Sequence, residues 1–198
     1  MSTHTLETTL RQQLEQADFK RVIIAYSGGL DSSVLLNAIS TLNLSVPVLA
    51  IHIHHGLSKF ADEWLAHCQL ECQRLNIPLY YEKVSLPNNS AGVGFSSEVT
   101  SGIELAARQA RYHIFNQYLQ VGDGILLAHH QDDQVETFMM RLMRGSGLTG
   151  LTAMEKQRAL GQGELLRPLL DLSRKELEEY AFLHNISHIE DDSNKNTE

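Results

Sequence analysis

Strand-length apolar runs alternate with helix-length segments along the chain, and this alternation limits the possible folds more than any other feature. The runs are continuously apolar rather than alternately apolar and polar, which indicates burial on both faces of a sheet. Segments with apolar residues at helical spacing separate them, as in βαβ units. The sequence therefore predicts an α/β fold with a mostly parallel sheet and helices on both faces. The runs are RVIIAYS (21–27), VPVLAIHIH (46–54), PLYYEKVSL (78–86) and GILLAHH (124–130).

The remaining segments follow from the same patterns. A lead-in helix is predicted over 5–17, where leucines recur at helical spacing. We expect residues 1–20 to form this lead-in and residues 21–198 to form one domain. The other predicted elements are helices over 34–42, 60–76, 104–120, 131–145 and 173–185, loops over 87–102 and 146–151, an extended piece over 164–170 and a last strand over 187–190.

Composition limits the class of function. The chain has 198 residues, of which 42% are hydrophobic, and this suits one globular core. Its formal net charge of −8 points away from broad binding to a phosphate backbone. Without a secretory signal or a long apolar stretch, we expect a cytoplasmic protein with no membrane partner. Cys68 and Cys72 are one helical turn apart, which favours packing on a helix face over a disulfide.

The first strand ends in the loop SGGLDSS, residues 27–33, directly before a helix. Glycines let the backbone approach a ligand closely, and a helix start offers unpaired N–H groups and a positive dipole end. The loop lacks both the Gly-Lys-Ser/Thr of a Walker motif and the GxGxxG dinucleotide pattern. We predict a phosphate-binding loop; the alternative is an ordinary helix cap made by Asp31 or Ser32.

Histidines and carboxylates follow two further strands. The second strand ends in HIHH, residues 52–55, and the fourth is followed by HHQDD, residues 129–133. Carboxyl ends of parallel strands form the edge at which α/β proteins bind ligands. Because no structural zinc spacing is present, zinc is the less favoured interpretation. Carboxylate oxygens that face a nucleotide suit Mg²⁺.

Three acidic residues share one face of the helix after the fourth strand. Asp132 and Asp133 precede Glu136 by four and three residues, so their like charges repel. An acidic first turn that suits the helix dipole would explain the two aspartates but not Glu136. A site for a cationic amine would explain all three, and we favour it.

Two arginines lie on one face of the helix before the fourth strand, at Arg108 and Arg111. They form either a solvated basic edge or a pair of guanidinium groups that reach phosphate or carboxylate oxygens.

SGGLDSS resembles the PP-loop of the N-type ATP pyrophosphatases, which adenylate a substrate and release pyrophosphate. The order of further segments, from about Val22 to Asn194, resembles that in the tRNA(Ile)-lysidine synthetases; they are IHIHHGLS, CQLECQRLNIPL, GIELAARQARY, AHHQDDQVETFMMRLMRGSGLTGLTAM, LLRPLLDLSRKEL and IEDDSN. The resemblance implies a Rossmann-like fold of the adenine nucleotide alpha hydrolase type, and a ligase that uses ATP and Mg²⁺. Its substrates would be L-lysine and the isoleucine tRNA with a CAU anticodon. The oxygen on carbon 2 of the wobble cytidine would be adenylated, and the lysine ε-amine would then displace AMP to give lysidine.

The resemblance also assigns roles by motif position. Asp31 and Asp133 would hold Mg²⁺, while Asp132, Asp133 and Glu136 would hold the lysine. Asp31, Arg108 and His129 would be catalytic, with Arg108 stabilising phosphate charge and His129 shuttling a proton from the amine. The tRNA contacts would be Arg111, Arg141 and Arg144. The ATP-binding residues would be Ser27, Gly28, Gly29, Leu30, Asp31, Ser32, Ile51, His52 and Ile53, with the backbone of 51–53 near the adenine.

Two other functions remain open. A 2-thiolating tRNA modifier of the same superfamily would need a sulfur carrier, and such enzymes usually have paired CxxC cysteines, whereas Cys68-x-x-x-Cys72 stands here. A non-catalytic ATP-binding module would not require Asp31 or the acidic helix. Family members continue beyond the equivalent of Glu198 with C-terminal tRNA-binding regions. We expect this chain to lack them, which would explain its acidic balance; a homodimer is left open.

Overall fold

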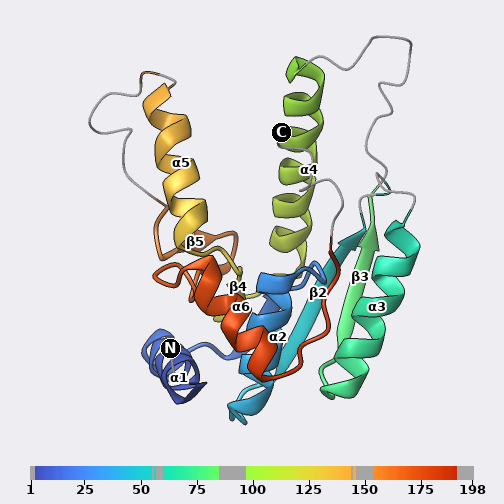
Figure 1. Ribbon diagram of the computed structural model, residues 1–198. Helices are drawn as coiled ribbons and strands as arrows, with labels where there is room; N and C mark the ends of the chain where they lie inside the picture. Colours follow the sequence, from blue (N-terminus) through green and yellow to red (C-terminus); the bar gives the residue numbers. More distant parts are fainter. Residues whose placement is uncertain are drawn as a thin grey trace.

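The computed structural model describes residues 3–54, 56, 60–84, 97–143, 145 and 154–190. A central sheet carries helices on both faces (Figure 1). The elements in chain order are α1 (Thr3–Ala17), β1 (Arg21–Ala25), α2 (Leu30–Thr41), β2 (Val48–His54), α3 (Ala61–Arg74), β3 (Leu79–Lys83), α4 (Ser97–Tyr118), β4 (Asp123–Leu126), α5 (Gln131–Met143), β5 (Gln157–Leu160), β6 (Gly163–Leu166) and α6 (Arg174–Leu183).

The six strands lie in the order β3-β2-β1-β4-β6-β5, and every neighbouring pair is parallel except β5 with β6. The chain moves outward from β1 to β2 and β3, then returns to place β4 on the other side of β1. The carboxyl ends of β1 and β4 therefore lie side by side at the point where the strand order reverses. Open α/β sheets bind their ligands at this point. The predicted Rossmann-like, mostly parallel sheet is confirmed.

Two hydrophobic clusters cover the two faces of the sheet. Successive residues of β1 serve both, because Val22 and Ile24 join one cluster and Ile23 joins the other. The first cluster receives side chains from α1, α2, α3 and α6, and the second from α4. This two-sided burial explains why the strand is continuously apolar in sequence.

The structure differs from the predicted elements in three places. The predicted last strand over 187–190 forms only a single bridge, between Gly29 and Ile189. The predicted loop over 87–102 is helical from Ser97 onward, where α4 begins. Residues 157–160, for which no strand was predicted, form β5, the antiparallel edge of the sheet. Residues 87–96 and 146–151 of the predicted loops lie outside the described residues.

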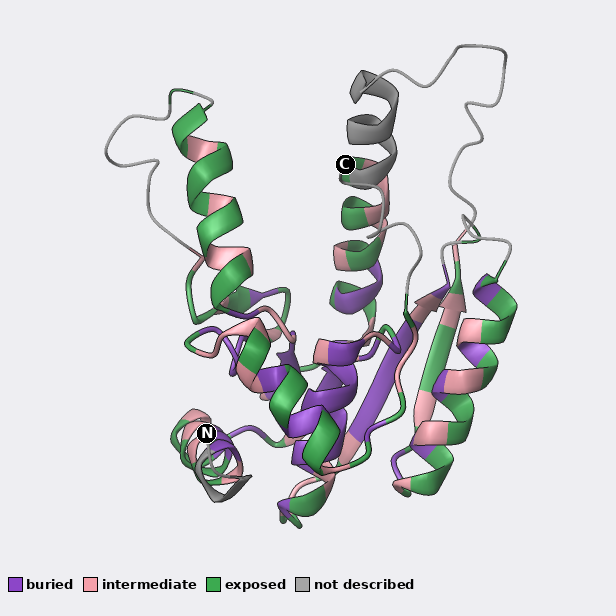
Figure 2. Cartoon of the chain, viewed as in Figure 1, coloured by how far each residue is buried: buried purple, intermediate pink, exposed green. Residues whose placement is uncertain are grey.

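α5 differs from the other helices because it contains no buried residue (Figure 2). It begins directly after β4 and rises beyond the carboxyl edge of the sheet, as does the N-terminal half of α4 (Figure 1). Among the described residues, no helix has the length and apolar character needed to cross a bilayer.

Candidate active site

The loop after β1 ends in an open helix start. Gly29 is the N-cap of α2, and no side chain of the described residues caps it. The alternative that Asp31 or Ser32 caps this helix is therefore wrong, since both lie inside the first turn. The Ser32 hydroxyl instead donates to the Gly29 carbonyl at 3.0 Å and lies 2.9 Å from the Ser27 hydroxyl. Hydroxyls and the positive end of α2 thus meet at one place, as phosphate binding requires.

Gly28 is required by the packing of this loop. Its φ of +89° lies in the left-handed region, and a Cβ there would come within 2.5 Å of Ile189 Cδ1 and 2.9 Å of Cys68 Sγ. The Ile189 amide donates to the Gly28 carbonyl at 2.9 Å. The loop is therefore held between α3 and the segment that follows α6.

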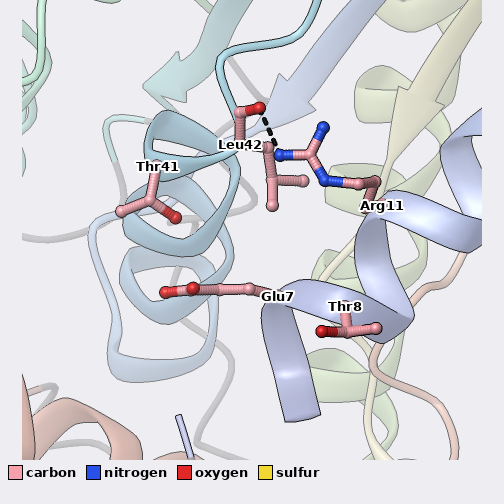
Figure 3. Close-up of a pocket in the computed structure, with 5 residues that line it drawn as sticks. All are labelled: Glu7, Thr8, Arg11, Thr41 and Leu42. Atoms are coloured by element: carbon pink, nitrogen blue, oxygen red, sulfur yellow. Dashed lines mark hydrogen bonds between the residues drawn. The ribbon is translucent and has the colours of Figure 1, made fainter. Parts of the chain in front are cut away.

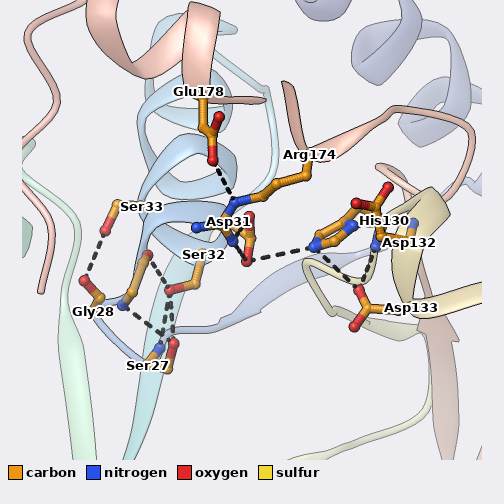
Figure 4. Close-up of polar contacts among 11 residues, drawn as sticks. Ser27, Gly28, Asp31, Ser32, Ser33, His130, Asp132, Asp133, Arg174 and Glu178 are labelled. Atoms are coloured by element: carbon orange, nitrogen blue, oxygen red, sulfur yellow. Dashed lines mark hydrogen bonds and ion pairs between the residues drawn. The ribbon is translucent and has the colours of Figure 1, made fainter. Parts of the chain in front are cut away.

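Asp31 lies in a network that joins the ends of β1 and β4 (Figure 4). Arg174 Nη1, from the start of α6, donates to both oxygens of Asp31 at 2.8 Å. On the other side, His130 Nε2 lies 3.7 Å from Asp31 Oδ2 and 3.5 Å from Asp133 Oδ2. The structure thus brings together the two carboxylates that the sequence assigns to Mg²⁺.

The acidic residues of α5 have structural as well as chemical roles. Asp133 accepts a hydrogen bond from the His130 amide at 2.8 Å, and His130 Nδ1 accepts one from the Asp132 amide at 3.3 Å. These reciprocal bonds cap the start of α5. Glu136 lies exposed one turn further along, and among the described residues none forms an ion pair with it. The helix-cap explanation therefore holds for Asp133 and leaves Glu136 unexplained.

The charges around Asp31 nearly balance one another. Burial raises the pKa of Asp31, and the neighbouring Asp133 raises it further, while Arg174 and His130 act in the opposite direction. A partly desolvated carboxylate beside a second carboxylate gains from a divalent ion. Within the described ranges, no group of three or more His, Cys, Asp or Glu side chains is arranged to hold a metal. A magnesium ion here would therefore need substrate oxygens to complete its coordination, which is the usual arrangement for Mg²⁺ with nucleotides.

A cationic group lies beside this network. Arg167, directly after β6, is only 3% exposed and donates from Nε to His129 Nδ1 at 3.2 Å. Arg108 and Arg158 both lie over the ring of Tyr112, at 5.2 and 5.3 Å from its centroid. The pKa of His129 is lowered to about 4, first by burial and then by the charge of Arg167, and Arg108 acts in the same direction. Guanidinium groups therefore gather beside the carboxyl end of β4.

The proposed RNA contacts are spread over two helices. Arg111 is exposed on α4, and Arg141 is half-buried in the last turn of α5. Arg144 lies outside the described residues.

The residues predicted to lie near the adenine belong to β2. The Ile51 carbonyl accepts from the Tyr26 amide at 2.9 Å, within the sheet. His52 is buried, and its Nδ1 lies 2.9 Å from the Tyr26 carbonyl oxygen, so the ring supports the loop from below. Ile53 packs against the cluster on the α4 face, and Leu30 is buried in the core.

Three site residues were given no role from the sequence. His130 was part of the HHQDD motif, and its place directly before a helix was the available signal for it. Arg174 and Arg167 lie in the segment LLRPLLDLSRKEL, but their partners could not be inferred from it, because they reach Asp31 and His129 across 143 and 38 residues of chain. Only the fold brings these pairs together.

A hollow of about 200 Å³ lies between α1 and the end of α2 (Figure 3). Arg11 Nη2 there donates to the Leu42 carbonyl at 2.6 Å, which satisfies a carbonyl at the C-terminus of α2. Because it lies away from the ends of β1 and β4, this hollow is part of the packing of α1.

Comparisons with known proteins agree with this geometry. A family model described as the PP-loop domain matches residues 2–198. The tRNA(Ile)-lysidine synthase of Serratia proteamaculans is 44% identical over 98% of this chain and 43% of its own length, and that of Pseudomonas aeruginosa is 49% identical over 87% and 37%. The chain thus spans about two fifths of the length of the curated relatives it matches.

Solved structures share the fold at low sequence identity. The U34-tRNA thiolase NcsA from Methanococcus maripaludis has a TM-score of 0.70 at 14% identity, covering 94% of this chain and 65% of that one. The NH3-dependent NAD synthetase from Campylobacter jejuni has a TM-score of 0.59 at 16% identity, covering 93% and 72%. With a nearly complete family match, an open phosphate-type loop and carboxylates at the switch point of the sheet, the chain belongs to the PP-loop domain family.

Proposed function

We propose that the chain is the nucleotide-activating part of an enzyme that joins L-lysine to carbon 2 of the wobble cytidine of the isoleucine tRNA with a CAU anticodon. The proximity of Asp133 to the 27–33 loop, which contains Asp31, supports this proposal, because phosphates bound by the loop would lie beside two carboxylates. We infer the substrates from the similarity to enzymes named tRNA(Ile)-lysidine synthase. The remaining length of those relatives would supply tRNA-binding regions, and the cytoplasm would be the location.

The loop would bind and orient the ATP phosphates. Backbone amides at the start of α2 and the hydroxyls of Ser27 and Ser32 would donate to phosphate oxygens. Asp31 and Asp133 would hold Mg²⁺, which would neutralise phosphate charge during attack by the cytidine oxygen. Asp31 would then exchange Arg174 for the metal ion. Adenylation is needed because the cytosine oxygen is otherwise a very poor leaving group.

The acidic face of α5 would receive the second substrate. The first two turns of α5 carry Asp132, Asp133 and Glu136. The two aspartates contact His130, whose Nε2 lies near Asp31. Carboxylates there would bind an ammonium group of lysine and hold the ε-amine near the activated carbon. Such positioning lowers the barrier of a two-substrate reaction by several kcal/mol.

The two cysteines argue against sulfur transfer. Both thiols are buried, and burial raises the pKa of Cys68 and of Cys72 to about 12. Reactive cysteines are exposed and have a depressed pKa. Cys68 instead packs under Gly28, where it supports the loop.

The substitution Asp31→Asn tests the proposed activation step. With tRNA and ATP, we expect pyrophosphate release by the 198-residue chain, or by a form extended to the length of its relatives, to fall at least 100-fold in the variant, a loss on the order of that for other electrostatic groups of active sites. Glu15→Gln is the matched control, since Glu15 is exposed on α1 away from the site. Turnover at the wild-type rate in Asp31→Asn would refute the role of Asp31.

Labelled lysine tests the second step. The extended protein should transfer label to the isoleucine tRNA in an ATP-dependent manner. Transfer of sulfur without lysine would instead identify a thiolating enzyme.

A further inference from the structure

The guanidinium of Arg167 is fixed in place before any substrate binds. Its Nη1 donates to the Glu155 carbonyl at 2.6 Å, and its own amide donates to the Lys156 carbonyl at 2.8 Å. The residue follows β6, whose neighbour in the sheet is β4, and β4 leads to His129. Because the side chain is almost fully buried, it has little freedom to leave His129.

The bond to His129 determines where the imidazole proton lies. A guanidinium has five N–H donors and no acceptor, so the atom that receives its Nε–H must have a free lone pair. That atom is His129 Nδ1, 3.2 Å away. A proton on Nδ1 would point at the Nε–H of Arg167, so a neutral ring has to carry its proton on Nε2.

We propose that Arg167 is a positioning residue which holds His129 as a neutral Nε2–H hydrogen-bond donor, and that His129 donates to a phosphate oxygen of the substrate instead of removing a proton from the amine. The inference rests on the proposed function and changes the role that the sequence suggested for His129. A base needs a free lone pair facing its substrate, and Arg167 occupies the lone pair of Nδ1.

The surroundings favour an anionic acceptor for this donor. Arg167 and Arg108 both act on His129 to keep it uncharged, and the low pKa of the ring, about 4, follows first from burial and then from Arg167. His129 is only partly buried and directly precedes His130, whose Nε2 faces Asp31. A fixed donor next to guanidinium groups stabilises negative charge that develops on a phosphate oxygen.

Nitrogen NMR of ¹⁵N-histidine-labelled protein tests the tautomer without substrate. His129 is assigned by the signal that disappears in His129→Gln. At pH 7 we expect Nδ1 unprotonated and Nε2 protonated in the wild type. In Arg167→Leu this preference should weaken, and in Arg167→Lys, which keeps a cationic donor, it should partly return. A protonated Nδ1 in the wild type, or a tautomer unchanged in Arg167→Leu, would overturn the proposal.

Two substitutions at His129 separate a donor from a base. Glutamine places an amide N–H near the position of Nε2 but has no basicity, whereas alanine has neither property. We expect the rate constant for pyrophosphate release to fall on the order of 100-fold in His129→Ala and less than about tenfold in His129→Gln. Equal losses in the two variants, or no loss in either, would overturn the role of His129 as a donor in the activation step. If the wild type released no pyrophosphate, the proposed function would fail, while the NMR result would still decide the tautomer.

Discussion

Single residues decide the chemistry of this site through partners that are distant in sequence. The loop from Ser27 to Ser33 was predictable, because glycine, hydroxyl and carboxylate residues stood between a strand and a helix. The partners of that loop were not predictable. Arg174 neutralises Asp31, and Ile189 packs on Gly28, although the segments that contain them gave no sign of these partners. Local chemistry could thus be inferred from residue types, while its electrostatic balance required the fold.

Protonation of His129 should make stability depend on pH. Its pKa is lowered from 6.5 in the unfolded chain to about 4 in the folded protein, so the unfolded state binds more protons between these values. The contribution of uncharged His129 to the free energy of unfolding is fully present above pH 6.5 and is lost as the pH falls toward 4. In metal-free buffer, we expect the wild type to lose about 2–3 kcal/mol more than His129→Gln between pH 7 and pH 4.5.

Urea unfolding at both pH values measures this difference. His113→Gln, at an exposed position of α4, leaves His129 and Arg167 in place and should keep the wild-type dependence. The same pH dependence in wild type and His129→Gln would show that His129 is not held uncharged.

Helices and strands were predictable where periodic apolar residues reach a core. β1, β2 and β4 carry buried runs, and α4 was predicted from 104 onward because its apolar positions recur at helical spacing. β5 was missed because it is an edge strand in which only Leu160 is buried, so QRAL shows no apolar run. The start of α4 was missed since glycine and serine usually indicate a loop. In both errors, the secondary structure was determined by contacts with other parts of the chain and not by local composition.

The first turn of α6 depends on a capping box. Ser173 Oγ accepts from the Glu176 amide at 3.3 Å, and the Ser173 amide donates to the Glu176 carboxylate at 2.9 Å. Ser173→Ala should therefore lower the free energy of unfolding by about 1 kcal/mol, while Ser173→Thr should keep most of it. Denaturant unfolding gives both values. An effect of the alanine variant no larger than that of threonine would mean that α6 depends only on its packing against α2.

The molecule as a whole has few cationic groups with which to hold a nucleic acid. Its 16 Lys and Arg are outnumbered by 24 Asp and Glu. The sequence therefore predicted weak backbone binding, and the structure gathers three of the described arginines, Arg108, Arg158 and Arg167, in a small group near β4.

Salt titration of tRNA binding tests this distribution of charge. With Arg111, Arg141 and Arg144 as phosphate contacts, the slope of log K against log[salt] for the 198-residue chain should be about −2 to −3. Arg111→Gln should reduce the magnitude of the slope by about 1, the contribution of one phosphate contact. Fluorescence anisotropy with labelled tRNA measures the slope. A value several times steeper would reveal a much wider contact surface than these three arginines provide.

The way Ile189 and Arg174 close around a loop that begins at Ser27 has a consequence for protein synthesis. During translation, residues 27–33 leave the ribosome long before Arg174 and Ile189. Until they emerge, Gly28 has no cover from Ile189 and Asp31 has no counter-charge from Arg174. A nascent chain therefore completes its nucleotide-binding loop only after residue 189 has emerged, and a product released before residue 174 would lack the ion pair at Asp31.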